Sequence, residues 1–491
     1  MKNNLPVQIT WHPCKQSKVP VYQQIVNFVY KKISSGEWNA GTYLPAQRRM
    51  AEIFDVNRST VVSAMEELAS YGIVAGKGRM GTKIISDTWS LMLPNALDWE
   101  KYINAGVFRA NKRIIRMINR FEFAPGIARI STGELDPRLF PTTMWSQVLQ
   151  KVSKENFTFN YLEALGAPCL RRVIAARMQK RGMRVSAANI LVTSGALQGL
   201  QLISVGLLKS NSVVYAETPG YLQSLRVFQS AGMKLRGVSM DKRGIEFWKL
   251  PANDIMKQKN KAFLYTIPTN HNPTGVTMSL SRRRELMEFC NKRQLPIIED
   301  GAYEELCFNN IPQSLKSMDE NNIVIYLGTV SKTLAPGLRV GWLVAPEPIV
   351  QRLGDVKMQM DYGTSSVSQL ILLEFLNSGF YDEHIKEVKQ ELLIRRDNAI
   401  AVLKKYCADI ASWNVPDGGF YIWMTFKNNI PIEKLFFAAL QRKILFNPGK
   451  IYDLMSNNSL RVSYSYLSCR EFAEAMKKFS EIIAELSIQH K

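Results

Sequence analysis

The 491-residue chain is poor in the residues that build metal sites and disulfide frameworks. Its six cysteines are scattered with no Cys-x-x-Cys pair, and its four histidines are isolated from one another. Zinc sites and disulfide-rich folds need such residues at short spacings, so we expect neither a metal site nor a disulfide scaffold. Scattered cysteines are typical of a protein in a reducing compartment.

Long apolar runs are also absent. The longest apolar stretches are interrupted by Lys, Gln or Gly before they reach the roughly 20 residues that cross a bilayer. The first residues, Met1 to Pro6, contain no apolar signal core. Together with the cysteine pattern, these features predict a cytoplasmic protein.

Acidic residues are scarce relative to basic ones. The chain has 42 Asp and Glu against 63 Lys and Arg, a formal net charge of +21. This excess favours a polyanionic partner, either nucleic acid or a membrane surface. The hydrophobic share of 46% indicates a globular protein, and the length indicates about three domains.

Three short helices are predicted near the N-terminus. Apolar residues at helical spacing indicate the first helix over residues 20–35, and Pro45 opens a second helix that ends at Phe54. Asn57 is suited to cap a third helix over residues 58–71. Two helices around a tight turn, with arginine and hydroxyl residues at the start of the second, are typical of a helix-turn-helix.

A basic, glycine-rich hairpin follows the third helix at residues 77–82, between two short apolar segments, and it is suited to be a wing. Residues 1–86 contain eleven Lys and Arg against five Asp and Glu. A basic helix face is often only solvated. Three helices followed by a basic hairpin favour DNA binding instead.

Residues 20–86 resemble the winged helix-turn-helix of the GntR family of bacterial regulators. The motif Leu-Pro-Ser-x-Arg-x-Leu-Ala corresponds to residues 44–51, Ser-Arg-x-Thr-Val to residues 57–61, and the wing Gly-Thr to residues 81–82. Ala46 replaces the motif serine, so we expect the loss of a cap or phosphate contact there. The resemblance implies that the DNA-binding residues are Arg48, Arg58, Ser59, Thr60 and Gly81.

A basic connector is predicted over residues 87–127. The segment from Lys101 to Arg120 contains several Lys and Arg residues and no acidic residue. Interleaved Ile114, Ile115 and Ile118 favour a packed helix with solvated charges, while additional phosphate contacts remain the alternative.

From residue 128 onward, short apolar strands alternate with helical segments, which is typical of a mostly parallel sheet covered on both faces. Ligands of such sheets bind beyond the carboxyl ends of the strands. Polar motifs follow five of the predicted strands, and each is common as a structural feature on its own. They centre on Gly195, Tyr221, Asn272, Asp300 with Tyr303, and Ser331-Lys332 with Arg339.

Taken together, these five motifs supply what pyridoxal 5′-phosphate requires. They offer a glycine turn for the phosphate, an aromatic ring for stacking and a partner for the ring hydroxyl. Asp300 can keep the ring nitrogen protonated, and Lys332 can form a Schiff base with the aldehyde.

Residues 130–488 resemble the fold-type I aminotransferases. The motifs Asn-Pro-x-Gly, Asp-x-x-Tyr and Ser-Lys-x-x-x-Pro-Gly-Leu-Arg-x-Gly are intact, whereas Leu197 replaces a glutamine that usually follows Gly-Ala. The resemblance implies that Tyr161 reaches the phosphate of a partner subunit in a homodimer, and that Arg461 binds a ligand carboxylate. It also implies phosphate contacts from Gly195, Ala196, Ser331 and Arg339, stacking by Tyr221, and contacts to the ring hydroxyl from Asn272 and Tyr303.

The complete layout resembles the MocR regulators. We predict a winged helix-turn-helix at 15–86, a linker at 87–127, and a fold-type I α/β domain at 128–491 whose small α/β subdomain begins near residue 380. The resemblance implies a homodimeric, pyridoxal phosphate-dependent regulator of transcription that binds operator DNA and senses the cofactor or an amine. Two alternatives stay open, a working aminotransferase with a DNA-binding domain and a binding module without cofactor.

Overall fold

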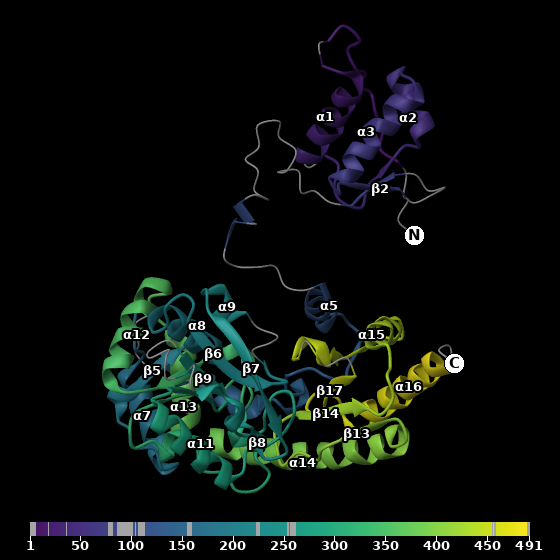
Figure 1. Ribbon diagram of the computed structural model, residues 1–491. Helices are drawn as coiled ribbons and strands as arrows, with labels where there is room; N and C mark the ends of the chain where they lie inside the picture. Colours follow the sequence, from purple (N-terminus) through teal and green to yellow (C-terminus); the bar gives the residue numbers. More distant parts are fainter. Residues whose placement is uncertain are drawn as a thin grey trace. The chain divides into compact units, whose positions relative to one another are not determined.

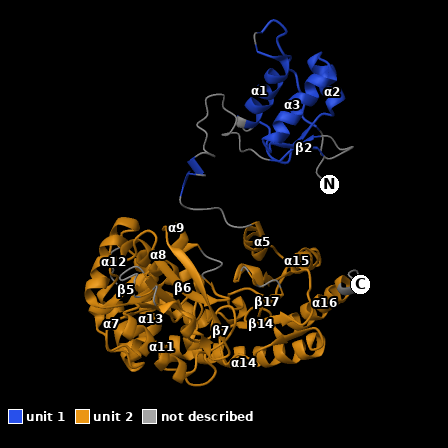
Figure 2. Cartoon of the chain, in the orientation of Figure 1, with its two compact units in different colours: residues 1–109 blue, residues 110–491 orange. Residues whose placement is uncertain are grey.

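The computed structural model describes residues 6–17, 19–35, 37–76, 82–85, 102–103, 105–106, 113–154, 160–221, 226–252, 255, 262–453, 455 and 458–488. The chain divides into two compact units, unit 1 at residues 1–109 and unit 2 at residues 110–491 (Figures 1 and 2). Within these described ranges, no helix has both the length and the apolarity needed to cross a bilayer.

Among its described residues, unit 1 has three helices of eight residues or more and a small antiparallel sheet of strand order β1-β3-β2. The helices are α1 (Val21–Ser34), α2 (Gln47–Phe54) and α3 (Arg58–Ser70), and the strands are β1 (Tyr43–Leu44), β2 (Val74–Gly76) and β3 (Thr82–Ile84). The three predicted helices are therefore confirmed, with ends that agree to within two residues.

The local chemistry of unit 1 explains these helix ends. The Asn57 side chain caps α3 by accepting a 3.0 Å hydrogen bond from the backbone N–H of Ser59, as predicted. No side chain caps α2, whose N-cap position is Ala46. Buried apolar residues of all three helices form one core, which Trp11 extends by stacking on Phe28 at 4.4 Å between ring centroids.

Unit 2 is built around an eight-stranded sheet of order β5-β12-β11-β10-β9-β6-β7-β8. The pairs β11-β10, β10-β9, β9-β6 and β6-β7 are parallel, which confirms the predicted mostly parallel sheet. The strands are β5 (Ile190–Thr193), β6 (Val213–Thr218), β7 (Lys234–Asp241), β8 (Gly244–Ile245), β9 (Ala262–Thr266), β10 (Ile297–Asp300), β11 (Val324–Thr329) and β12 (Gly341–Val344).

Helices cover both faces of this sheet because alternate strand residues point to opposite sides (Figure 1). On β5, Leu191 packs with α8 (Ala196–Gly206) and α12 (Glu347–Met360), next to the short α9 (Val227–Ser230). Val192 packs on the other face with the helices that cover that side. These are α6 (Thr142–Lys154), α7 (Pro168–Lys180) and α13 (Ser366–Asn377), and α11 (Leu280–Arg293) covers the same face farther along the sheet.

A second, antiparallel sheet of order β13-β14-β17-β16 forms the C-terminal part of unit 2. Its strands are β13 (Ala411–Trp413), β14 (Tyr421–Phe426), β16 (Asn447–Pro448) and β17 (Ser459–Ser463), and its helices are α14 (Phe380–Cys407), α15 (Ile432–Gln441) and α16 (Cys469–Ile488).

Residues that precede the large sheet in sequence also join this part. Strand β4 (Ala128–Arg129) pairs with β15 (Ile444–Leu445), and α5 (Arg113–Glu122) packs Ile118 into the main core. The packed helix predicted in the basic connector is therefore present.

Candidate functional site

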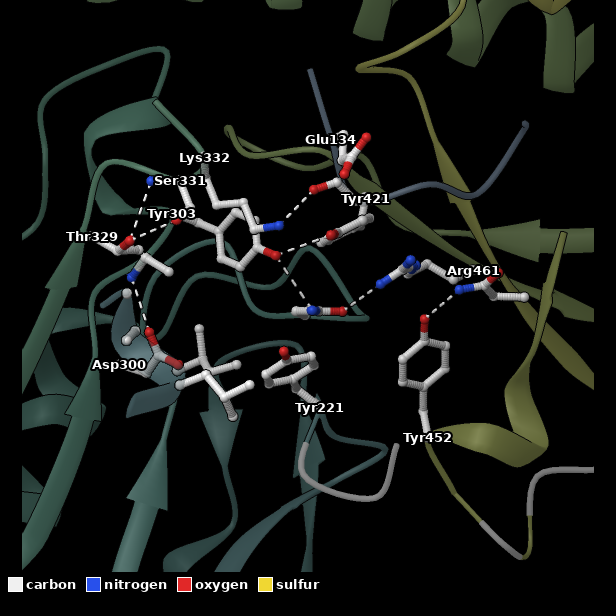
Figure 3. A pocket seen from close by; sticks show the side chains of 18 of the residues that line it. Glu134, Tyr221, Asp300, Tyr303, Thr329, Ser331, Lys332, Tyr421, Tyr452 and Arg461 are labelled. Atoms are coloured by element: carbon white, nitrogen blue, oxygen red, sulfur yellow. Dashed lines mark hydrogen bonds between the residues drawn. The ribbon is translucent and has the colours of Figure 1, made fainter. Parts of the chain in front are cut away.

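A cavity of about 430 Å³ lies at the carboxyl ends of the parallel strands of unit 2, within the roughly 300–1,000 Å³ typical of small-molecule sites (Figure 3). Ten residues predicted to form the site converge on it from separate elements of the chain. They are Gly195, Ala196, Tyr221, Asn272, Asp300, Tyr303, Ser331, Lys332, Arg339 and Arg461.

Lys332 enters the cavity from the turn that follows β11. The Thr329 hydroxyl accepts a 3.2 Å hydrogen bond from the backbone N–H of Ser331 and donates to the Ser331 hydroxyl at 3.0 Å (Figure 3). Lys332 Nζ donates a 2.7 Å hydrogen bond to the carbonyl of Gly133. The turn thus holds a primary amine inside the cavity, with a hydroxyl beside it.

An anion cradle lies at the N-terminus of α8. Gly195 has φ +86°, and Arg339 Nη2 donates a 2.9 Å hydrogen bond to the neighbouring Ser194 carbonyl. A Cβ added at Gly195 would lie 2.8 Å from Arg339 Nη2. Free backbone N–H groups at a helix start, next to a guanidinium, form a site suited to phosphate.

Asp300 supplies a buried carboxylate at the end of β10. It accepts hydrogen bonds from the Tyr265 hydroxyl at 2.7 Å and from the Ala302 backbone N–H at 3.1 Å. Burial raises the pKa of Asp300 despite these hydrogen bonds. A cationic ring N–H against this carboxylate would compensate the cost of burying its charge.

Arg461 occupies the other side of the cavity, on β17. Its Nη1 donates to Asn272 Oδ1 at 2.9 Å, and its Nη2 donates to the Ser131 carbonyl at 2.6 Å. The guanidinium lies 4.2 Å from the ring centroid of Tyr421 and 5.0 Å from that of Tyr452. Its Nε is buried and has no partner within the described residues, and each Nη carries a second N–H, so the guanidinium retains donors for a ligand oxygen.

Phenols line the space between Asp300 and Arg461. The hydroxyls of Tyr303 and Tyr421 are 3.0 Å apart, and Asn272 Nδ2 donates to the Tyr303 hydroxyl at 3.4 Å. Burial raises the pKa of Tyr303 and of Tyr221, so both phenols stay protonated. Tyr221 presents its ring toward the centre of the group in Figure 3.

The sequence motifs do not predict several of the residues that line the cavity. Helix α5 contributes Ile115, Ile118, Asn119 and Glu122, and the C-terminal part contributes Tyr421, Asn447 and Tyr452. No short motif marks these positions. Strand β14 pairs with β17 so that Trp423 lies opposite Arg461 and Tyr421 lies opposite Ser463. Because every second residue of a strand lies on the same face, Tyr421 shares the face of Arg461.

Tyr161 does not line this cavity in the described structure. Its side chain is 83% exposed, and its ring packs on Tyr362 at 4.7 Å between centroids. Tyr362 is also exposed, so the two rings form a small apolar surface patch.

The predicted DNA-binding residues of unit 1 lie on α2 and at the start of α3. Arg48, Arg58 and Ser59 are exposed, and Thr60 is half-buried. Because Arg58 is the first residue of α3, it lies where a recognition helix meets DNA. Gly81 lies outside the described residues.

Comparison with known proteins matches each unit to a family. Residues 21–84 match the bacterial regulatory proteins of the gntR family, and residues 130–479 match aminotransferase class I and II. The uncharacterized HTH-type transcriptional regulator YisV of Bacillus subtilis is 46% identical over 97% of this chain and 98% of its own length.

Two solved structures resemble unit 2. A kynurenine aminotransferase of Pyrococcus horikoshii, in complex with PMP, has a TM-score of 0.74 and 27% identity over 79% of this chain and 98% of its own. The α-aminoadipate aminotransferase LysN of Thermus thermophilus, complexed with N-(5′-phosphopyridoxyl)-L-leucine, has a TM-score of 0.73 and 28% identity over 80% of this chain and 100% of its own.

Pyridoxal 5′-phosphate fits the cavity of this chain. The cradle that only a glycine permits at residue 195 matches the phosphate, and the buried Asp300 carboxylate matches a protonated ring nitrogen. The Lys332 amine and the unpartnered Arg461 Nε complete the donor set that the cofactor and an amino acid would use. The fold and this donor set agree on pyridoxal phosphate as the cofactor.

Proposed function

Because the chain belongs to the MocR-type regulators, in which a GntR-family DNA-binding domain precedes an aminotransferase class I and II domain, we propose that its cavity senses pyridoxal phosphate or an amino-group effector and controls operator binding accordingly. The observation that carries this proposal is the convergence of Lys332 and Arg461 on one cavity. A protein that binds chromosomal DNA in this way acts in the cytoplasm.

Pyridoxal phosphate supplies an aldehyde that reacts reversibly with primary amines. Lys332 would provide the amine that attaches the cofactor, and Asp300 would hold a proton on the ring nitrogen. The phosphate would be bound by Gly195, Ala196, Ser331 and Arg339, all of which line the cavity. Tyr221 would stack on the ring, and Asn272 and Tyr303 would contact the ring hydroxyl.

The effector is held by its carboxylate at Arg461. Each Nη of this arginine uses one of its two N–H groups on Asn272 or Ser131, so the second N–H of each Nη and the Nε–H remain for a ligand. An amino acid whose carboxylate binds there has its amine directed toward Lys332. Such a ligand shifts operator affinity only if it binds the two conformations of the regulator with different affinities.

DNA is bound by Arg48, Arg58, Ser59, Thr60 and Gly81 of unit 1. The exposed first turn of α3 carries an arginine and two hydroxyl side chains, which are suited to phosphates and base edges. The net charge of +21 adds a nonspecific, salt-sensitive attraction to DNA.

The active form is a homodimer. The exposed patch of Tyr161 and Tyr362 is the kind of apolar surface that marks a protein interface. Burying this patch against a second copy would cover it and carry Tyr161 toward the partner's phosphate site.

The second candidate function is a working aminotransferase. It is favoured by the intact lysine, carboxylate and arginine of the cavity and by the two similar aminotransferase structures. The test is the rate at which the protein transfers an amino group to an added keto acid. A steady rate far above that of free pyridoxal phosphate would make catalysis, and not regulation, the leading function.

The central test titrates amino acids into the cofactor-loaded protein while the cofactor absorbance and the operator affinity are both recorded. We expect one class of amine to change both signals together. Lys332→Ala is expected to abolish the absorbance band of the attached cofactor and the response to amines. An operator affinity that no amine and no pyridoxal phosphate changes would refute the sensing function, although DNA binding itself would persist.

A further inference from the structure

Two carboxylates that line the cavity have no role in the site described above. Of the charged lining residues, Asp300, Lys332, Arg339 and Arg461 are assigned to the cofactor or to a carboxylate. Glu122 and Glu134 are left, and neither forms an ion pair with any lysine or arginine of the described structure. A negative charge in a partly enclosed site is costly unless a cation accompanies it.

Glu122 is the last residue of α5, and three other residues of that helix line the same cavity. Its one described hydrogen bond is accepted from the Thr132 hydroxyl at 2.5 Å. The carboxylate interacts electrostatically with Arg461 and with Tyr452, so it lies on the effector side of the cavity. A carboxylate can accept about four hydrogen bonds, so Glu122 retains capacity for a ligand.

Glu134 differs from Glu122 in its surroundings. It lies beside the Gly133 carbonyl that binds Lys332 and also lines a neighbouring apolar pocket with Leu135 and Leu338. In Figure 3 its side chain projects away from Tyr303 and Tyr221. Of the two acids, Glu122 is therefore better placed to meet the far end of an effector bound by Arg461.

We propose that the effector is an amino acid with a second cationic group, of the lysine or ornithine type, whose distal ammonium is bound by Glu122. This inference rests on the sensing function proposed above and specifies its ligand class. The carboxylate binds Arg461, the α-amine faces Lys332, and the side-chain ammonium pairs with Glu122 close to Thr132. The carboxylate and the distal ammonium of such a ligand then each have a partner of opposite charge within one cavity.

The position of Glu122 in the chain connects recognition with regulation. Helix α5 is the first described helix of unit 2 after the segment that leads from unit 1. An effector that pairs with Glu122 therefore contacts this helix directly, whereas a neutral amino acid of the same length lacks that ionic contact. We expect the charged ligand to have the larger effect on operator affinity.

The experiment compares L-lysine with L-norleucine, which has the same carbon chain but no distal ammonium. Each is titrated by calorimetry into the full-length, cofactor-loaded protein, and operator affinity is measured in parallel. In the wild type we expect L-lysine to bind about tenfold more tightly or better, as one charge-assisted contact allows. Cadaverine, which lacks the carboxylate, is expected to bind more weakly than L-lysine because it cannot use Arg461.

Three variants at two positions separate the role of Glu122 from the general charge of the cavity. Glu122→Gln is expected to bring the lysine-to-norleucine affinity ratio close to one, and Glu122→Asp to restore part of it. Glu134→Gln removes the same charge from the cavity wall and is expected to keep the ratio near that of the wild type. Cofactor absorbance, recorded for each variant, shows that the cavity has folded.

Three results would overturn this inference while the sensing function stands. These are a wild type that binds both amino acids equally, a Glu122→Gln variant that still prefers L-lysine, and a Glu134→Gln variant that loses the preference to the same extent. If neither an amino acid nor pyridoxal phosphate changes the operator affinity, the sensing function fails, and the ligand class proposed for it fails as well.

Discussion

Gly195 offers the most direct test of the phosphate cradle. Its backbone has φ +86° and ψ 164°, a conformation that is almost exclusive to glycine. In a Gly195→Ala variant, the new Cβ would lie 2.8 Å from Arg339 Nη2 and 3.3 Å from its Cζ. The arginine side chain can move away, but doing so breaks its 2.9 Å hydrogen bond to the Ser194 carbonyl.

The substitution has two separable costs. Backbone strain at residue 195 lowers the free energy of unfolding of the cofactor-free protein by about 1–3 kcal/mol. Displacing the Arg339 guanidinium removes a hydrogen bond to a charged group, worth about 1.5–3 kcal/mol, from the bound phosphate. The dissociation constant of pyridoxal phosphate should therefore rise roughly tenfold to hundredfold.

The assay combines urea unfolding of the cofactor-free protein with a titration of pyridoxal phosphate followed by absorbance. Gly337→Ala is the matched control, because Gly337 lies in the same loop region as Arg339 and an added Cβ there has nothing within 4 Å. We expect this control to behave like the wild type. A Gly195→Ala variant that binds pyridoxal phosphate as tightly as the control would refute the assignment of the cradle.

Three further predictions concern DNA, assembly and pH. Arg58→Ala should weaken operator binding and reduce the slope of log affinity against log salt by about one, and an unchanged slope would contradict the phosphate contact of α3. Tyr161→Ala should favour the monomer in sedimentation equilibrium and weaken cofactor binding, and a stable, fully loaded dimer would contradict the interface proposed at this patch. Burial lowers the pKa of His384 to about 4, below its ordinary value near 6.5. His384 then binds a proton more readily in the unfolded chain than in the folded one. The free energy of unfolding should therefore fall as pH decreases from about 6.5 to about 4, by up to about 1.4 kcal/mol per pH unit. Denaturation of a His384→Leu variant across this range should show a smaller decrease than the wild type, and an equal decrease would contradict the assignment to His384.

Much of the fold and of the cofactor site follows from short stretches of the sequence. The ends of α1, α2 and α3 are predictable because capping and apolar spacing act within a few residues, as the Asn57 cap of α3 shows. Lys332, Asp300 and Gly195 are predictable as a group for a different reason. Each follows a strand of a parallel sheet, and the carboxyl ends of such strands meet at one edge.

Residues brought in by distant pairing are not predictable in this way. Arg461 is oriented by the Ser131 carbonyl, 330 residues away in sequence, and by Asn272, 189 residues away. Nothing local to Arg461 specifies these partners. The resemblance to aminotransferases implied its role, but its unpartnered Nε is visible only once the strands β14 and β17 have paired.

The sequence by itself determined the two-part architecture, the helices of unit 1 and the strand-end residues that suit pyridoxal phosphate, since these depend on local spacing and on a general property of parallel sheets. The tertiary structure alone decided which side chains close the cavity. It placed Glu122 of the basic connector and Tyr421 of β14 opposite the cofactor residues, because the packing of α5 and the pairing of β14 with β17 depend on contacts between segments that are distant in the sequence.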